Sequence, residues 1–145
     1  MNNYQLDDRV RRALSRGHRI DITTTGRRTG LPRRIELVFH NIDGRIYISG
    51  LPSRRKRAWI YNLEADPRMT LHLKSVGEDL PARARVVVDV AERRTILGEV
   101  ARAWHRDDVD VMVAASPLIE VLFEGLAAEP ATEAASGTSS EPAPA

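Results

Sequence analysis

The sequence predicts a mainly β, α+β fold, namely a six-stranded antiparallel β-barrel, closed or partly closed, with peripheral helices. Six short segments alternate apolar and polar residues with the two-residue period of a β-strand, and turn signals separate them. Segments with helical spacing lie before and between these strands. The strands are expected in meander order, each pairing with the next. At 145 residues the chain is long enough for one domain with a core of its own.

The first part of the chain predicts one helix and three strands. Residues 4–16 place apolar side chains at helical spacing with arginines between them, and this amphipathic helix should end near Gly17. Three strands are then expected, at residues 18–25, 33–40 and 45–49. The sequence Asn41-Ile42-Asp43-Gly44 is typical of a tight hairpin turn between the second and third strands.

The second part predicts the remaining elements. A short helix over residues 54–65 should stop before Pro67, because proline disfavours helical backbone in the residue before it. Two antiparallel strands follow, and then a helix, a short helical turn and a last strand. We expect these five elements at residues 69–74, 82–90, 91–104, 108–115 and 117–124.

Residues 127–145 contain only Ala, Glu, Pro, Thr, Ser and Gly, a composition that cannot bury enough surface to form a core. We therefore expect a domain over residues 1–126 and a disordered tail over 127–145. The chain has 22 lysine and arginine residues against 20 acidic ones, and three of the acids lie in that tail. The positive charge of the domain favours an anionic ligand. Nucleic acid is not expected, because aromatic residues are few and no helix carries a long basic stripe.

Several classes of site are excluded by composition. Cysteine is absent, so no disulfide or thiolate chemistry is available. The four histidines lie far apart in the sequence, and no metal site is expected. No apolar run approaches the roughly 20 residues of a membrane span, and the N-terminus lacks a signal-peptide pattern. A cytoplasmic protein without an integral membrane segment is the expectation.

The turn between the first two strands carries the most informative motif. It contains Thr24, Thr25, Gly26, Arg27, Arg28 and Thr29, and ends at Gly30. Glycine lets backbone N–H groups approach an anion closely, and hydroxyl and guanidinium groups can bind phosphate oxygens. The motif therefore predicts a phosphate-binding turn. A hairpin with a solvated basic tip is the alternative.

Four motifs in order form a recognisable pattern. They are Thr23-Thr24-Thr25-Gly26-Arg27-Arg28-Thr29-Gly30 with Pro32-Arg33, then Ile48-Ser49-Gly50, then Trp59-Ile60-Tyr61-Asn62-Leu63, and finally Ala65-Asp66-Pro67 before a strand. Over about residues 18–125 the chain resembles the deazaflavin-dependent nitroreductase family of split β-barrel, FMN-binding-like proteins. Members of that family use coenzyme F-420, a deazaflavin with a phosphodiester and a polyglutamate tail, and resemble pyridoxamine-phosphate oxidases in fold.

The resemblance implies roles for particular residues. The turn at residues 24–29 would meet the phosphate and acidic tail of the cofactor, while Ser49 and Gly50 would present backbone amides to the deazaflavin ring. A second phosphate clamp would come from Arg54, Arg55, Lys56 and Arg57 at the start of the helix. Trp59 and Asn62 would fix that helix beside the cofactor groove.

Each of these roles has a structural alternative. Trp59 is equally consistent with core packing, Asn62 with tying down a loop, and the basic run with a solvated face. Tyr61 is the candidate proton donor to a reduced substrate, and it is equally consistent with an ordinary half-buried tyrosine.

The resulting hypothesis is an oxidoreductase that transfers hydride from reduced coenzyme F-420 to a small electrophilic acceptor, namely a quinone, an enone or a nitroaromatic compound. FMN is the alternative cofactor, although the excess of arginine favours the longer acidic one. A non-catalytic split barrel that binds a flavin-like, haem-like or fatty-acyl ligand is the other alternative. By analogy with split barrels, a homodimer is expected.

Overall fold

The computed structural model describes residues 8–16 and 19–124. The expected tail at 127–145, the first residues of the predicted N-terminal helix and the end of the domain at residue 126 lie outside the described residues. In the described part of the chain, no helix is long and apolar enough to cross a membrane.

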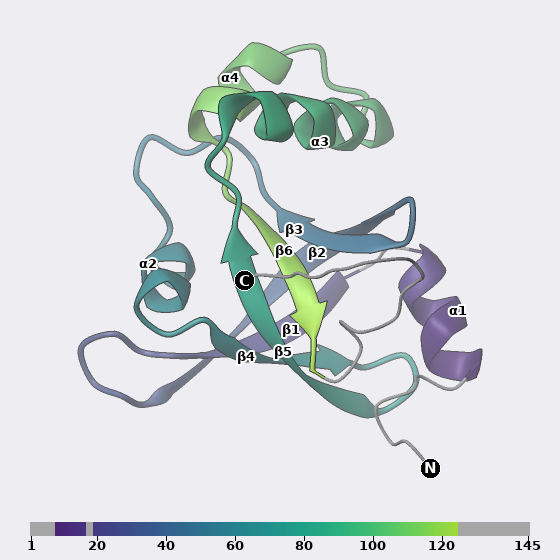
Figure 1. The fold of residues 1–145 in the computed structure, drawn as a ribbon, viewed down its shortest axis with the longest axis vertical. Coiled ribbons are helices and arrows are strands. Elements are labelled where there is room, and N and C mark those ends of the chain that lie inside the picture. The colour runs from purple at the N-terminus through teal and green to yellow at the C-terminus, as the bar shows by residue number, and fades with distance from the viewer. Residues whose placement is uncertain (1–7, 17–18, 125–145) are drawn as a thin grey trace, which may run out of the picture.

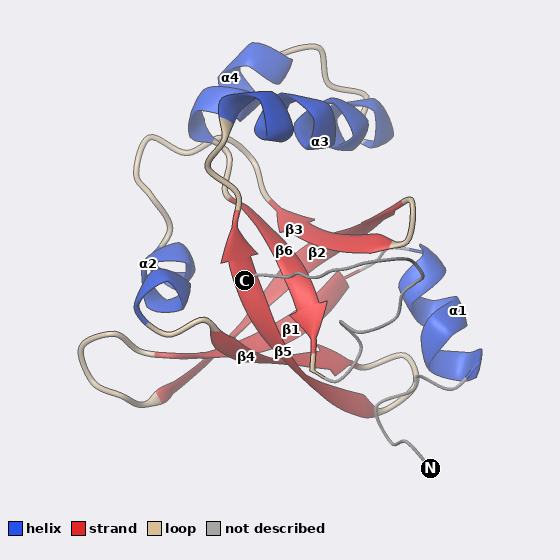
Figure 2. Cartoon of the chain, in the orientation of Figure 1, coloured by secondary structure: helices blue, strands red, loops and turns tan. Residues whose placement is uncertain are grey.

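Six strands close into one antiparallel barrel, as the sequence predicted (Figures 1 and 2). Around the barrel their order is β1-β2-β3-β6-β5-β4. The strands are β1 (Arg19–Thr25), β2 (Pro32–Ile42), β3 (Arg45–Ser49), β4 (Arg68–Leu73), β5 (Glu78–Val86) and β6 (Leu118–Phe123). Closure gives each of the six strands a hydrogen-bonded neighbour on both sides.

The predicted meander order is wrong. The barrel consists of two three-stranded meanders, β1-β2-β3 and β4-β5-β6, and β1 pairs with β4 while β3 pairs with β6. The chain crosses from β3 to the far side of β1 through residues 50–67, which include helix α2 (Ala58–Ala65). That connection is too long for a hairpin, and alternation of apolar residues defines the face of a strand but not its neighbour.

The other helices are α1 (Asp8–Arg16), α3 (Val90–Ala103) and α4 (Val109–Ala115). Figure 1 shows α3 and α4 together over one end of the barrel, with α2 and α1 beside the strands on opposite sides. Helix α2 is shorter than predicted, because Arg57 has extended backbone angles (φ −69°, ψ 144°) and residues 54–57 precede the helix. Strand β5 begins earlier than predicted, because its pairing with β4 extends to Leu73 and Glu78.

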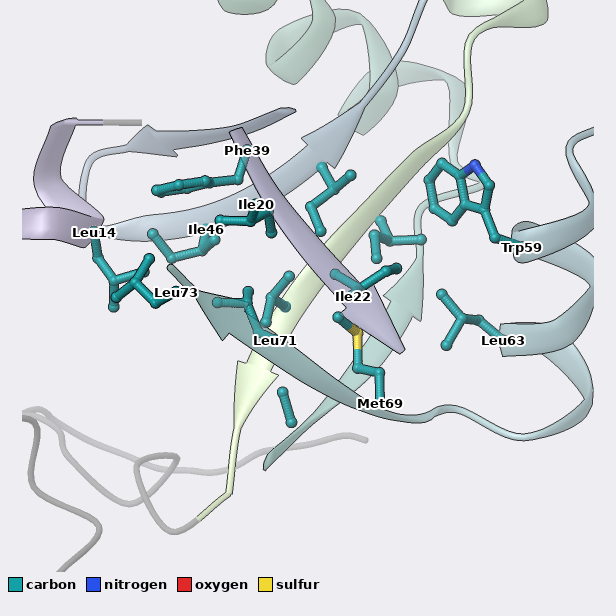
Figure 3. Close-up of a cluster of buried hydrophobic side chains, with 14 of the residues drawn as sticks. Leu14, Ile20, Ile22, Phe39, Ile46, Trp59, Leu63, Met69, Leu71 and Leu73 are labelled. Carbon is teal, nitrogen blue, oxygen red and sulfur yellow. The ribbon is translucent and has the colours of Figure 1, made fainter. Parts of the chain in front are cut away.

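The barrel interior is filled by the inward-facing side chains of the strands, among them Ile20, Phe39 and Leu71 (Figure 3). Trp59 and Leu63 point from α2 toward these strands and belong to the same buried cluster. A second cluster packs α3 and α4 against the outside of the barrel, with Tyr47 and Leu118 among its members. The fold thus leaves α4 and the start of β6 facing the segment that precedes α2.

Candidate functional site

A cavity of about 490 Å³ lies where the segment before α2, the end of β5 and the connection from α4 to β6 meet. Its size falls in the range of small-molecule sites. The apolar part of the lining includes Ile60, Val87 and Leu118. Charged groups lie on two sides of it.

One side is a basic rim, which we define as Arg54, Arg55, Lys56 and Arg57. Lys56 is neutralised by Glu64, whose carboxylate oxygens lie 2.7 and 2.8 Å from Nζ. Arg57 donates to the carbonyl of Leu51 at 2.9 Å. The exposed guanidinium groups of Arg54 and Arg55 have no acidic partner within the part of the chain that the structure describes. These two arginines are therefore available to an anionic ligand.

The segment that carries the rim is held in place by backbone contacts. Its Ser53 N–H donates to the carbonyl of Ala115 at the end of α4, at 3.0 Å. The Ser53 hydroxyl donates to the Arg55 carbonyl at 2.7 Å. The first bond attaches the segment to α4, and the second holds its local conformation. Together they fix one wall of the cavity.

The other polar side is formed by Arg93 of α3, a residue that the sequence analysis did not select. Its guanidinium group donates to the carbonyls of Val87 and Val113 at 2.9 Å each. It also donates to the carbonyl of Ser116 at 2.6 Å and to that of Met112 at 3.4 Å. No carboxylate pairs with it among the described residues, and burial alone lowers the pKa of Arg93. The half-buried positive charge of Arg93 thus lies in the cavity wall without a carboxylate partner among the described residues.

Ser116, next to Arg93, was also missed. The side chain is only 4% exposed and lines the cavity, yet its hydroxyl has no hydrogen-bond partner in the described structure. A buried hydroxyl without a partner is costly in a folded protein. No local pattern distinguishes either residue, because they come together only when α3 packs against the start of β6.

Two backbone N–H groups of the turn between β1 and β2 donate hydrogen bonds within the turn itself. Gly26 N–H donates to the carbonyl of Leu31, and Gly30 N–H to that of Gly26, both at 2.8 Å. These two N–H groups are therefore satisfied within the turn. Gly26 is required for compactness, since a Cβ there would lie 2.8 Å from Thr29 Oγ1.

The turn is fastened to α2 beside the basic rim. Asn62 accepts a hydrogen bond from the Arg27 N–H at 3.0 Å and donates to Thr24 Oγ1 at 3.2 Å. The exposed ring of Tyr61 lies 4.6 Å from both the Arg27 guanidinium carbon and Lys56 Nζ. Asn62 thus ties down the turn, and the turn adds the charges of Arg27 and Arg28 next to the rim.

Several predicted site residues do not line the cavity. Trp59 is buried in the barrel core, as its structural alternative stated. Ser49 is buried and its hydroxyl donates to the carbonyl of Pro117 at 2.8 Å. A Cβ at Gly50 would lie 3.1 Å from Pro117 Cγ, so this glycine makes room for the proline. Tyr61, Thr24, Thr25, Gly26 and Thr29 also lie outside the lining.

A second cavity of about 400 Å³ lies between β2 and the last turns of α3. His40 and Trp104 line it, with ring centroids 5.2 Å apart. Burial lowers the pKa of His40, and its Nε2 atom has no partner in the described structure.

The first cavity fits a ligand with a flat apolar body and an anionic extension. Its lining joins apolar side chains to the unpaired arginines of the rim, and the orphan hydroxyl of Ser116 shows that one polar group there still needs a partner. Within residues 8–16 and 19–124, no group of three acidic or histidine side chains is arranged to hold a metal ion.

Solved structures share this fold. A conserved hypothetical protein from Mycobacterium tuberculosis is 16% identical, with 86% of this chain and 84% of that chain covered and a TM-score of 0.66. A putative pyridoxamine 5'-phosphate oxidase from Listeria innocua is 13% identical, with 83% and 94% covered and a TM-score of 0.61. An F420-H2 dependent reductase is 19% identical, with 71% and 92% covered and a TM-score of 0.52. At these identities the likeness concerns the fold alone.

The fold alone does not indicate the reaction, but a match to a family model does. The model described as F420H(2)-dependent quinone reductase matches residues 3–121, which is most of the chain and includes every residue that lines the first cavity. The chain therefore belongs to the F420H(2)-dependent quinone reductase family and is an oxidoreductase that depends on coenzyme F-420.

Proposed function

We propose that the cavity beside the basic rim is the coenzyme F-420 site and that the enzyme reduces a small quinone there. The observation that carries this proposal is the pairing of an apolar lining with two arginines, Arg54 and Arg55, that have no acidic partner among the described residues. A deazaflavin with an acidic tail presents the complementary pair of properties.

In this proposal the apolar side chains of Ile60, Val87 and Leu118 contact the flat ring and exclude water from it. The guanidinium groups of Arg54 and Arg55 bind the phosphate, because planar guanidinium forks match phosphate oxygens. Lys56 and Arg57 are already engaged by Glu64 and Leu51, so they mainly hold the rim in shape.

The turn between β1 and β2 contributes through its side chains. The N–H groups of Gly26, Gly30 and Arg27 are occupied, and the side chains of Arg27 and Arg28 extend the positive charge of the rim along the flank of α2. We propose that this charge attracts the polyglutamate tail. The remaining predicted site residues, Thr24, Thr25, Gly26, Thr29 and Asn62, shape the turn that presents these two arginines.

The bound cofactor supplies hydride in its reduced form. A quinone acceptor would gain that hydride and one proton to become the hydroquinone, and the proton taken up would be balanced by the one that the cofactor releases to water on oxidation. The chain therefore needs to orient two flat molecules and exclude bulk water, and it needs no nucleophile. We assign no proton transfer to Tyr61, because this exposed ring lies outside the cavity and between two cations. Enones and nitroaromatic compounds have the same electrophilic character and are further candidate acceptors.

We also propose a homodimer. Val88 lies in the lining of the cavity and is 74% exposed, and Leu51, beside the rim, is 54% exposed. A second subunit that covered these side chains would remove their apolar surface from water. Sedimentation velocity of the purified protein tests this, and a monomer at every concentration would contradict it.

The test of the proposed function is a pair of binding titrations. Purified protein is titrated into coenzyme F-420 and, separately, into FMN, and the fluorescence of each cofactor is followed. We expect a saturable change with F-420 that weakens with salt, and a weaker or absent change with FMN, whose single phosphate uses fewer of the arginines. Oxidation of the reduced cofactor on addition of a water-soluble benzoquinone then tests the acceptor. Binding of FMN alone would contradict the cofactor assignment of this cavity.

A further inference from the structure

The part of the first cavity's wall that α3 and the connection from α4 to β6 form carries two polar groups that the proposed function leaves unexplained. They are the guanidinium group of Arg93 and the hydroxyl of Ser116. They lie side by side, since Arg93 Nη2 donates to the backbone carbonyl of Ser116 at 2.6 Å. In Figure 1, β5 leads into α3, and β6 begins beneath α4.

Arg93 has one hydrogen-bond donor more than its partners use. A guanidinium group carries five N–H donors and no acceptor. The described structure gives it one bond from Nε, one from Nη1 and two from Nη2, all to backbone carbonyls. One N–H on Nη1 therefore has no acceptor in the described structure.

The charge of Arg93 is also without a partner. The other half-buried arginine of this region, Arg85, donates to the carboxylates of Glu92 and Glu120, which raise its pKa. Among the described residues, the partners of the Arg93 guanidinium group are four neutral backbone carbonyls. Glu64, the carboxylate that lines the cavity, is engaged by Lys56 at 2.7 Å. An electron-rich atom placed beside Arg93 would thus meet an attractive charge that no acid in the described residues cancels.

Ser116 supplies the second donor. Ser116 lines the same cavity, and its hydroxyl oxygen is buried away from solvent and has no partner among the described residues. It can rotate to donate to an acceptor beside Arg93.

We propose that Arg93 and Ser116 form an oxygen-binding pair that donates two hydrogen bonds to one carbonyl or enolate oxygen of a ring bound in this cavity. The proposal rests on the proposed function of the cavity. One spare N–H and one hydroxyl suit a single oxygen, whereas a phosphate with its several oxygens suits the exposed arginines of the basic rim. The ring oxygen belongs either to the cofactor or to the quinone, and the positive charge stabilises negative charge that it gains during reduction.

The decisive variant is Ser116→Ala, because it removes a hydroxyl that the fold does not use. Its thermal unfolding temperature should therefore not fall. Arg93→Lys keeps the charge but loses the guanidinium fork, and it is expected to unfold at a lower temperature because four carbonyl contacts depend on that fork. The matched controls lie on α3, the helix that carries Arg93. Thr95→Ala removes a hydroxyl that bonds to the Ala91 carbonyl, and Arg94→Lys changes an exposed arginine paired with Asp110.

Two quantities are measured for each protein, namely the Kd of coenzyme F-420 from fluorescence titration and the KM of a water-soluble benzoquinone at saturating reduced cofactor. We expect Ser116→Ala to raise one of them about 3- to 10-fold, the range of a single neutral hydrogen bond. Arg93→Lys should raise the same quantity by more than about 10-fold, since its bond is charge-assisted. Both controls should stay within about twofold of the wild type, the error of such comparisons.

The outcomes separate the possible sources of the oxygen. A raised Kd places the oxygen on the cofactor, and a raised KM with unchanged Kd places it on the quinone. Unchanged values of both quantities in folded Ser116→Ala overturn the proposal while the proposed function stands. If the wild-type protein fails to bind coenzyme F-420, the proposed function fails and this inference fails with it.

Discussion

The side-chain amide of Asn62 joins the turn between β1 and β2 to helix α2, because its Oδ1 atom accepts a hydrogen bond from the Arg27 N–H at 3.0 Å. Its Nδ2 atom donates to Thr24 Oγ1 at 3.2 Å. Asn62 is 7% exposed, so both bonds are shielded from water. One side chain thus positions the arginines of the turn relative to the basic rim.

Replacing Asn62 by alanine should lower the free energy of unfolding by about 1–3 kcal/mol, because two groups lose their partners in a buried place. Chemical denaturation measures this loss. Thr24→Val is the matched control, since it keeps the bond between Asn62 and the Arg27 N–H and removes only the acceptor of the second bond. A smaller loss for Asn62→Ala than for Thr24→Val would contradict the assigned role.

The two arginine pairs should contribute unequally to cofactor affinity. Arg54→Ala/Arg55→Ala is expected to weaken coenzyme F-420 binding by about 10-fold or more, because these side chains line the cavity and their charge-assisted bonds would be lost. Arg27→Ala/Arg28→Ala should have a smaller effect, because the turn lies outside the lining and acts through screened charge.

Titrations at low and high salt distinguish these two contributions. Both double variants should show a weaker salt dependence than the wild type. Unchanged affinity and salt dependence in Arg27→Ala/Arg28→Ala would mean that the turn is only a solvated basic tip, the alternative that its sequence left open.

Glu120 of β6 is expected to be a major contributor to stability. It is 3% exposed and accepts two hydrogen bonds from Arg45, at 2.8 and 2.9 Å, and two from Arg85. Glu120→Gln removes the charge that neutralises both arginines. We expect a loss of about 2–4 kcal/mol in the free energy of unfolding, somewhat below the cost of breaking a fully buried pair because Arg45 is solvated on one side.

Glu99→Gln provides the comparison for Glu120. Glu99 pairs with Arg102 on the exposed surface of α3, so its loss should cost about 0–1 kcal/mol. Equal effects of the two substitutions in denaturation experiments would show that burial of Glu120 adds nothing.

His40 should make stability depend on pH. Burial lowers the pKa of His40 from its usual value of 6.5, so the unfolded chain takes up a proton at a higher pH than the folded one. The fold therefore loses stability as the pH falls below about 6.5, while above that value both states are neutral at this residue.

Denaturation midpoints measured on either side of this pH check the prediction. His40→Gln should reduce the loss of stability on acidification. His105→Asn, at an exposed position with φ 57° that asparagine tolerates, should leave most of it unchanged. Identical acid sensitivity in wild type and His40→Gln would exclude His40 as the cause.

Much of the fold could be predicted from local sequence patterns. The hairpin at residues 41–44 was predicted from its sequence alone, and the structure has Asp43 and Gly44 at φ 53° and 85°, with the Gly44 N–H bonded to Asn41 Oδ1 at 2.9 Å. Alternation correctly indicated six strands, because a barrel buries one face of each strand. The position of Asn62 in the Trp59–Leu63 motif also marked a residue with a specific role.

The candidate site was only partly visible in the sequence. Arg54 and Arg55 were selected from their charge and do line the cavity. Arg93 and Ser116 were not selected, because they lie 23 positions apart. Nothing nearby in the sequence indicates that the Arg93 guanidinium group reaches the Ser116 carbonyl. The bonds that the Gly26 and Gly30 N–H groups make within the turn were not foreseen, because a motif does not reveal which backbone groups bond to one another.

The sequence by itself thus determined the secondary structure, the barrel class, the basic character of the site and the family resemblance, since these depend on residue type and short spacing. The tertiary structure decided that β3 pairs with β6, that Trp59 belongs to the core and that Arg93 faces Ser116. The physical reason is that strand pairing and side-chain burial are settled by the closure of the whole barrel. Apolar surface and backbone hydrogen bonds from distant segments must be satisfied together, and no short segment contains that information.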